Sequence, residues 1–107
     1  MTVLRVGYKS GVRFDHDYYM TKHLPLTGAV MGPYGVKSVE VMRVTAAPDG
    51  SAAAYQVIFS AYFESAAALQ NALNGPRMGE VLADIPKYYD AAPDIWIGEV
   101  VPLPQTA

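Results

Sequence analysis

The sequence contains no cysteine and only two histidines. A chain without cysteine forms no disulfide and offers no thiolate as a nucleophile or metal ligand. Two histidines are also too few for a three-histidine zinc site. The glycines are scattered and do not form the Gly-rich fingerprint of a dinucleotide-binding loop. The sequence therefore excludes a three-histidine zinc site and carries no recognisable site for a dinucleotide cofactor.

Charge is scarce as well. Only 17% of the residues are charged, the formal net charge is −2, and no block of Lys or Arg occurs. Binding to a nucleic-acid backbone needs concentrated positive charge, so we expect no nucleic-acid partner. No apolar run is long enough to cross a bilayer or to form the core of a signal peptide. We therefore expect a cytoplasmic protein with no membrane partner.

Hydrophobic residues are abundant instead. They make up 51% of the 107 residues, a length typical of one domain. We expect the domain to span residues 1–101 and residues 102–107 to form a flexible C-terminal tail, because this stretch contains prolines and follows the last predicted strand. The hydrophobic fraction is high for a small soluble domain, which indicates that the chain buries more than one monomer's core.

Residue patterns predict four strands and two helices. The strands are rich in β-branched and aromatic residues and cover residues 2–9, 34–45, 54–63 and 94–101. One helix begins near Asp15 and ends at Gly32-Pro33. The second has Ser65 as its N-cap, covers residues 66–74, and resumes after Gly75-Pro76 as a short helical turn at residues 78–85. Turn-rich loops are expected at residues 46–51 and 86–93. The order β-α-β-β-α-β predicts an α+β ferredoxin-like sandwich, a four-stranded antiparallel sheet with two helices on one face.

Both faces of this predicted sheet are apolar. Residues 55–63 and 95–97 carry large apolar groups at odd and at even positions. A sheet with one face in water alternates between apolar and polar residues, so we expect the helix-free face to be buried against a second copy of the chain. The sequence thus predicts a homodimer. Four charged residues on the strands can pair within one sheet or across the dimer: Arg5, Glu40, Arg43 and Glu99.

The first helix places an imidazole on its apolar face. At about 100° per residue, one narrow stripe carries Tyr19, His23, Leu26 and Val30, flanked by Met20 and Met31. Pro25 lacks a backbone N–H and its ring crowds the preceding turn, so it should kink or break the helix two residues after His23. His23 is either a core residue with satisfied nitrogens or a proton-transfer group at a cleft.

Other polar residues near this helix also have two interpretations. Asp15 and Asp17 fit helix capping and stabilisation of the helix dipole better than a catalytic carboxylate pair. His16 lies in the first turn, where it either contacts a ligand or faces solvent. Tyr88 and Tyr89 either line the mouth of a pocket or pack a loop. The sequence leaves the roles of His16, Tyr88 and Tyr89 open.

These segments resemble the EthD family, which is named for a protein linked to ethyl tert-butyl ether degradation and belongs to the dimeric α/β barrel superfamily. The matching segments are FDHDYYMTKHLPL (14–26), YGVKSVEV (34–41), YFES (62–65) and ADIPKYYD (83–90). The resemblance implies a homodimer whose two sheets face each other, with a pocket between sheet and helices in each subunit. Many relatives use no metal and no organic cofactor, so none is expected here. His23 corresponds to the motif histidine, next to the motif proline at Pro25.

The resemblance leaves two hypotheses for function. Family members are often labelled reductases, and related barrel proteins act on aromatic polyketides, lactones and similar ring compounds. The first hypothesis is a cofactor-independent enzyme of the oxidoreductase or isomerase, cyclase or dehydratase type, with His23 as its catalytic residue. Its compact cyclic or aromatic substrate would contact Tyr19, Met20, Leu26 and Tyr88. The second is a non-catalytic homodimer that binds a hydrophobic metabolite.

Overall fold

The protein forms one four-stranded antiparallel sheet in the order β2-β3-β1-β4. A computed structural model describes residues 1–104, so residues 105–107 of the predicted tail lie outside the described residues. The strands are Thr2–Lys9 (β1), Val36–Arg43 (β2), Tyr55–Phe63 (β3) and Asp94–Glu99 (β4). The predicted α+β ferredoxin-like architecture is confirmed, with strand ends at most two residues from those predicted.

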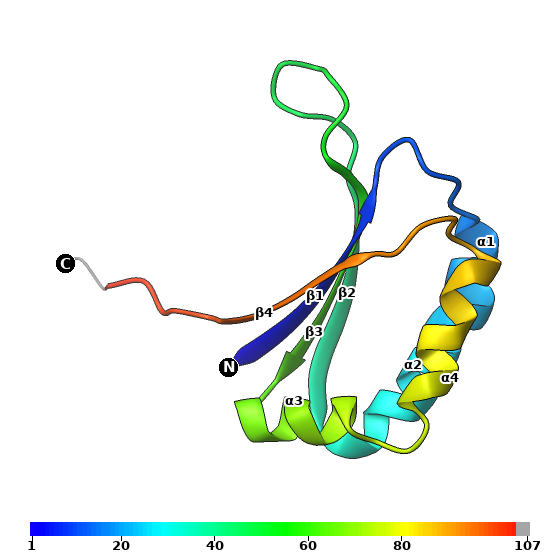
Figure 1. Ribbon diagram of the computed structural model, residues 1–107. Coiled ribbons are helices and arrows are strands. Elements are labelled where there is room, and N and C mark those ends of the chain that lie inside the picture. Colours follow the sequence, from blue (N-terminus) through cyan, green and yellow to red (C-terminus); the bar gives the residue numbers. More distant parts are fainter. Residues whose placement is uncertain (105–107) are drawn as a thin grey trace.

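The helices lie against one face of this sheet (Figure 1). The first helical stretch contains α1 (His16–Tyr18), the π-helical segment η1 (Tyr19–His23), α2 (Leu24–Met31) and the 3-10 turn η2 (Gly32–Tyr34). The second contains α3 (Ala66–Leu73), α4 (Met78–Asp84) and the 3-10 turn η3 (Ile85–Lys87). Helices α2 and α4 lie side by side over the sheet, whereas α3 lies near one end of the strands (Figure 1).

Both helical stretches begin with the predicted caps. The Asp15 carboxylate accepts a hydrogen bond from the Tyr18 backbone N–H at 3.0 Å, and the Ser65 hydroxyl accepts one from the Ala68 N–H at 3.1 Å. These bonds satisfy backbone donors that the first turn of a helix leaves free. The Asp15 backbone N–H also donates to the Tyr88 carbonyl at 2.8 Å. The start of α1 is thereby attached to the segment that follows η3.

The predicted break at Pro25 is wrong in its position. The chain stays helical as far as Met31, and the irregular part is η1, which ends two residues before Pro25. There the Leu24 N–H donates to the carbonyl of Tyr19, five residues earlier. Pro25 donates no backbone hydrogen bond and its ring crowds the carbonyl four residues before it, and the wider π turn accommodates that ring. Because a π turn contains more residues than an α turn, the 100° projection loses phase along η1.

The main core lies between the sheet and the helices. The side chains of β1 that face the helices are paired across the sheet with those of β3: Leu4 with Ala61, Val6 with Phe59 and Tyr8 with Val57. The predicted loop at residues 86–93 also contributes to this core, because Tyr88 and Tyr89 are 0% and 1% exposed. Both tyrosines thus pack this loop into the core.

The opposite face of the sheet carries both polar and apolar side chains. Arg5 Nη2 donates to the Tyr62 hydroxyl at 3.5 Å, and that hydroxyl donates to Glu40 Oε1 at 2.8 Å, so a tyrosine links the two charged residues. The rings of Tyr55 and Trp96 pack against each other with centroids 5.7 Å apart. Within residues 1–104 no helix covers this face (Figure 1).

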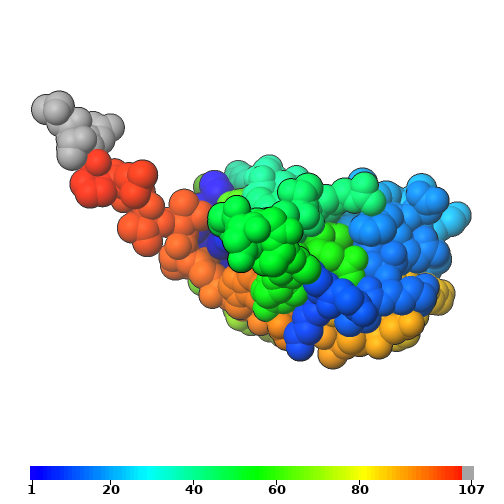
Figure 2. Space-filling view, turned by 90° about the horizontal axis from the view of Figure 1, so that it is seen from above, coloured from blue at the N-terminus to red at the C-terminus, as the bar shows by residue number. Residues whose placement is uncertain are grey.

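The segment after β4 leaves the body of the molecule. Figure 2 shows it projecting beyond the sheet, and residues 100–104 are all exposed. Across the described residues, none of the helices is both long enough and apolar enough to cross a membrane.

Candidate functional site

His23 is the last residue of η1 and lies between the helices and the sheet. It is 4% exposed, which confirms the predicted inward position. Its ring packs against the rings of Tyr19 and Tyr88, with centroids 5.6 Å and 4.5 Å away. Its backbone carbonyl accepts a hydrogen bond from the Thr27 hydroxyl at 2.9 Å. The two ring contacts hold the imidazole between Tyr19 and Tyr88.

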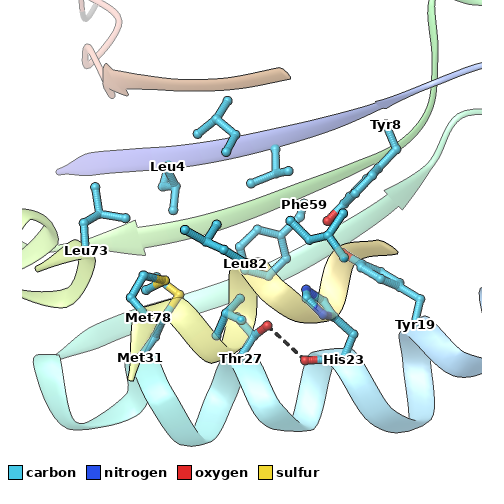
Figure 3. A pocket seen from close by; sticks show the side chains of 14 residues that line it. Leu4, Tyr8, Tyr19, His23, Thr27, Met31, Phe59, Leu73, Met78 and Leu82 are labelled. Atoms are coloured by element: carbon cyan, nitrogen blue, oxygen red, sulfur yellow. Dashed lines mark hydrogen bonds between the residues drawn. The ribbon is translucent and has the colours of Figure 1, made fainter. Parts of the chain in front are cut away.

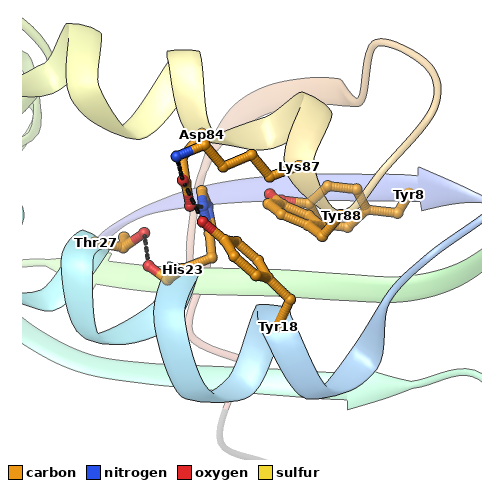
Figure 4. Close-up of polar contacts among 7 residues, drawn as sticks. All are labelled: Tyr8, Tyr18, His23, Thr27, Asp84, Lys87 and Tyr88. Carbon is orange, nitrogen blue, oxygen red and sulfur yellow. Dashed lines mark hydrogen bonds and ion pairs between the residues drawn. The ribbon is translucent and has the colours of Figure 1, made fainter.

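Asp84 is the partner of His23 and was missed in the sequence analysis. It is the last residue of α4, and its Oδ2 lies 3.0 Å from His23 Nδ1 (Figure 4). Its Oδ1 accepts a hydrogen bond from the Tyr18 hydroxyl at 2.7 Å and lies 3.5 Å from Lys87 Nζ. One signal in the sequence could have found it, because helical spacing places Asp84 on the same buried face of α4 as Val81.

Asp84 is a buried carboxylate that stays ionised. Burial alone raises the pKa of the Asp84 carboxyl group. The hydrogen bonds from Tyr18 and His23 and the positive charge of Lys87 outweigh burial, so the pKa lies below the ordinary value for aspartic acid. A carboxylate accepts hydrogen bonds and donates none, so the proton of the neutral His23 ring resides on Nδ1.

His23 is a neutral imidazole near pH 7. Burial lowers the pKa of His23 below its ordinary value, and the hydrogen bond and charge of Asp84 oppose this effect without cancelling it. With Nδ1 protonated toward Asp84, the basic lone pair is on Nε2. No side chain within residues 1–104 makes a hydrogen bond to Nε2. The arrangement is a base oriented by a carboxylate, which is suited to proton transfer.

An apolar cavity of about 70 Å³ adjoins the imidazole (Figure 3). Strands, helices and η3 all contribute to its wall: Leu4, Val6, Tyr8, Tyr19, His23, Thr27, Met31, Phe59, Leu73, Met78, Val81, Leu82, Ile85 and Ile95. Two of these side chains, Leu82 and Ile95, are both 52% exposed, so the cavity reaches the surface beside them. No lysine and no arginine lines it.

Two tyrosines, Tyr8 and Tyr19, line the cavity, and both side chains are buried. The hydroxyls of Tyr8 and Tyr88 share a hydrogen bond of 2.7 Å. Tyr19 is 1% exposed, and its buried hydroxyl has no hydrogen-bond partner within the described part of the chain. Burial raises the pKa of all three phenols above the ordinary value for tyrosine. The cavity therefore presents neutral hydroxyls beside a neutral imidazole.

The predicted ligand-contacting residues separate into two groups. Tyr19 lines the cavity together with His23, as expected. Tyr88 packs against the imidazole and is not part of the cavity wall, and Leu26 is partly buried and packs against the core. Met20 is exposed and lines a separate groove. Met20 follows Tyr19 by one residue, which is about 100° of helical rotation, so its side chain leaves the helix in a different direction from that of Tyr19.

That separate groove lies between η1 and the strands β2 and β3 and has a volume of about 220 Å³. Its walls include His16 and Arg43, and Tyr19 contributes to both this groove and the cavity. His16 thus belongs to a different part of the surface from His23. Throughout residues 1–104 no three side chains of His, Asp or Glu lie close enough together to hold a metal ion.

Comparisons with known proteins show which family this chain resembles. The sequence model of the EthD domain matches residues 12–92. An EthD-like protein from Ralstonia eutropha JMP134 is 30% identical, and the match covers 94% of this chain and 91% of that one with a TM-score of 0.81. No protein with a curated functional description matches the chain.

Two more distant structures show the fold alone. An ethyl tert-butyl ether degradation (EthD) family protein from Bacillus halodurans C-125 is 20% identical over 94% of this chain and 97% of that one, with a TM-score of 0.73. A protein described as a candidate antibiotic biosynthesis monooxygenase from Deinococcus radiodurans is 10% identical over 100% and 99% of the two chains, with a TM-score of 0.60.

Proposed function

The chain belongs to the EthD family, and from this premise we propose that it is a small-molecule enzyme in which His23 transfers a proton on a compact cyclic substrate. One observation carries the proposal: Asp84 Oδ2 lies 3.0 Å from His23 Nδ1, beside an apolar cavity to which the same imidazole contributes. A carboxylate that fixes the tautomer of a histidine leaves the second nitrogen basic and oriented.

The electrostatics favour general-base catalysis. His23 is neutral near pH 7, so it accepts a proton without first having to lose one. The imidazolium that forms lies next to the ionised Asp84, which stabilises its positive charge. Acid and base steps of this kind serve isomerisation, cyclisation and dehydration. No metal or organic cofactor enters the proposal.

We further propose that the active protein is a homodimer formed through the helix-free face of the sheet. That face exposes Met42 and Trp96, which are 57% and 38% exposed, next to the hydrogen-bonded pair Tyr62 and Glu40. Large exposed apolar groups on a sheet face favour association. Light scattering at micromolar concentration should return about twice the 11.6 kDa of one chain. A mass of one chain would contradict the dimer.

A non-catalytic binding protein is the second candidate. The closed packing around His23 favours it, because an imidazole that is only 4% exposed and paired with a buried carboxylate also fits a purely structural role. In that case the cavity holds a hydrophobic metabolite and His23 only shapes the wall.

An isotope-exchange experiment separates the two candidates. Cyclic ketones and lactones are incubated with the protein in D₂O, and loss of the protons next to the carbonyl is followed by NMR. We expect the wild-type protein to catalyse exchange, and His23→Gln to lose roughly 10²–10⁴-fold in rate while remaining folded. His16→Gln is the matched control and should keep the rate. Full exchange activity in His23→Gln excludes His23 as the base, and binding without exchange in the wild type supports the binding protein.

A further inference from the structure

The hydroxyl of Tyr19 is the most unusual polar group in the molecule. It is buried, the neighbouring Tyr8 hydroxyl and the other groups of the described chain lie outside hydrogen-bond geometry to it, and its side chain lines the cavity next to His23. A buried hydroxyl without a partner destabilises a fold, because its desolvation is not compensated. In Figure 3 the side chains of Tyr19 and Tyr8 extend toward each other from the helix and from the strand. The Tyr8 hydroxyl already shares a hydrogen bond with Tyr88.

From this hydroxyl we infer that the cavity binds a neutral, largely apolar ring compound with one hydrogen-bond-accepting oxygen, which enters oxygen first and accepts a hydrogen bond from Tyr19. The inference rests on the functional site proposed above and names the class of ligand that this site selects. Cyclic ketones and lactones carry such an oxygen in a carbonyl group, and phenols carry it in a hydroxyl group.

The lack of a positively charged side chain among the described residues of the cavity wall favours a neutral ligand. The cavity wall contains no lysine or arginine, and burial keeps the phenols of Tyr8 and Tyr19 protonated by raising their pKa. The ionised Asp84 carboxylate lies behind His23, and the Lys87 ammonium that pairs with it at 3.5 Å lies outside the cavity wall. A carboxylate ligand would lose its hydration, find no cation in the wall and face a like charge, so an anionic ligand is disfavoured.

The shape of the site sets the orientation of the ligand. The polar groups lie at the closed end, where Tyr19 and His23 are 1% and 4% exposed. The open end is apolar and is formed by Leu82 and Ile95, each 52% exposed. The volume of about 70 Å³ is smaller than the roughly 150 Å³ of an apolar cavity that holds benzene, so part of a ring must remain beside Leu82 and Ile95.

Binding of simple probes tests the inference without any turnover. Cyclohexanone, phenol, toluene and benzoate are titrated into the wild-type protein and into Tyr19→Phe by NMR. We expect Tyr19→Phe to bind cyclohexanone and phenol roughly 3–10-fold more weakly than the wild-type protein does. This factor corresponds to the loss of one neutral hydrogen bond. Toluene should bind the two proteins equally, and benzoate should bind at least tenfold more weakly than cyclohexanone. Contacts between the bound ring and the Ile95 methyl groups should be visible as nuclear Overhauser effects.

Thermal unfolding supplies the second measurement. In the absence of ligand, Tyr19→Phe should unfold at the same or a higher temperature, because the deleted hydroxyl has no partner. Tyr8→Phe is the matched control and should unfold at a lower temperature, because it breaks the bond to Tyr88. The inference is overturned if Tyr19→Phe unfolds at a lower temperature and binds all four probes more weakly by the same factor. It is also overturned if benzoate binds the wild-type protein as tightly as cyclohexanone does. Either result leaves the isotope-exchange test of His23 unaffected.

Discussion

Asp84→Asn is the sharpest test of the pair that supports the proposed chemistry. Asparagine keeps the volume of the side chain and one acceptor oxygen, but it removes the negative charge and turns the second oxygen into a donor. In the wild-type protein the two carboxylate oxygens accept hydrogen bonds from different partners, His23 Nδ1 at 3.0 Å and the Tyr18 hydroxyl at 2.7 Å. With the amide, one of these partners has to change from donor to acceptor, and neither hydrogen bond is any longer assisted by the negative charge.

Asp84→Asn should decrease the stability of the protein because a buried site loses a charge-assisted hydrogen bond. Hydrogen bonds to charged groups contribute about 1.5–3 kcal/mol each, so we expect Asp84→Asn to lower the free energy of unfolding by about that amount at pH 7. The charge of Asp84 raises the pKa of His23 against the effect of burial. Without that charge, the pKa of His23 should fall further below its ordinary value.

NMR titration measures this shift directly. The chain contains two histidines, so only two imidazole Cε1–H signals need to be assigned. The signal of His23 should titrate at a lower pH in Asp84→Asn than in the wild-type protein, and isotope exchange should slow by roughly 10²-fold or more because the tautomer is no longer fixed. Asp90→Asn is the matched control, since Asp90 pairs with Arg13 at the surface. A His23 signal that titrates at the same or a higher pH in Asp84→Asn would refute the coupling.

Three further predictions concern His23, Gly7 and Met42. Because the pKa of His23 is lowered in the folded state, the unfolded chain binds a proton first as the pH falls below about 6.5, and stability should decline toward pH 5 by at most about 1.4 kcal/mol per pH unit from this group. In His23→Gln, the free energy of unfolding measured with urea should fall less steeply between about pH 6.5 and pH 5, because the contribution of His23 is absent. Gly7→Ala should destabilise the protein, because a Cβ there would lie 2.7 Å from the Tyr55 ring and 3.1 Å from Trp96; thermal unfolding measures this. Met42→Asp should yield a folded monomer by light scattering if the helix-free face is the dimer interface.

The fold was predictable because its signals are local and agree with one another. Asp15 and Ser65 are capping residues at the starts of helical segments, and the strands are dense in β-branched and aromatic residues. The order of these segments leaves few topologies for a chain of this length. The capping bonds and the antiparallel pairing of β2 with β3 appear in the structure as the sequence predicts.

The site was predictable only in part. His23 and Tyr19 lie four residues apart on one helical stretch, so a periodicity argument places them together. Asp84 is 61 residues from His23, and helical periodicity within one element carries no information about a contact over that distance. Met20 lies on the flank of the projected stripe, about 100° of rotation from Tyr19, and in the structure its side chain is exposed and lines the separate groove.

The features that sequence reasoning missed lie around the same cavity. The π turn of η1, the buried carboxylate of Asp84 and the unpartnered hydroxyl of Tyr19 each depart from what a stable core favours. A site needed only for packing would be better served by a regular helix, an apolar residue in place of Asp84, and phenylalanine in place of Tyr19. Their convergence on one imidazole is difficult to explain by stability. The ligand proposed above, which bonds to Tyr19 and exchanges a proton with His23, would account for it.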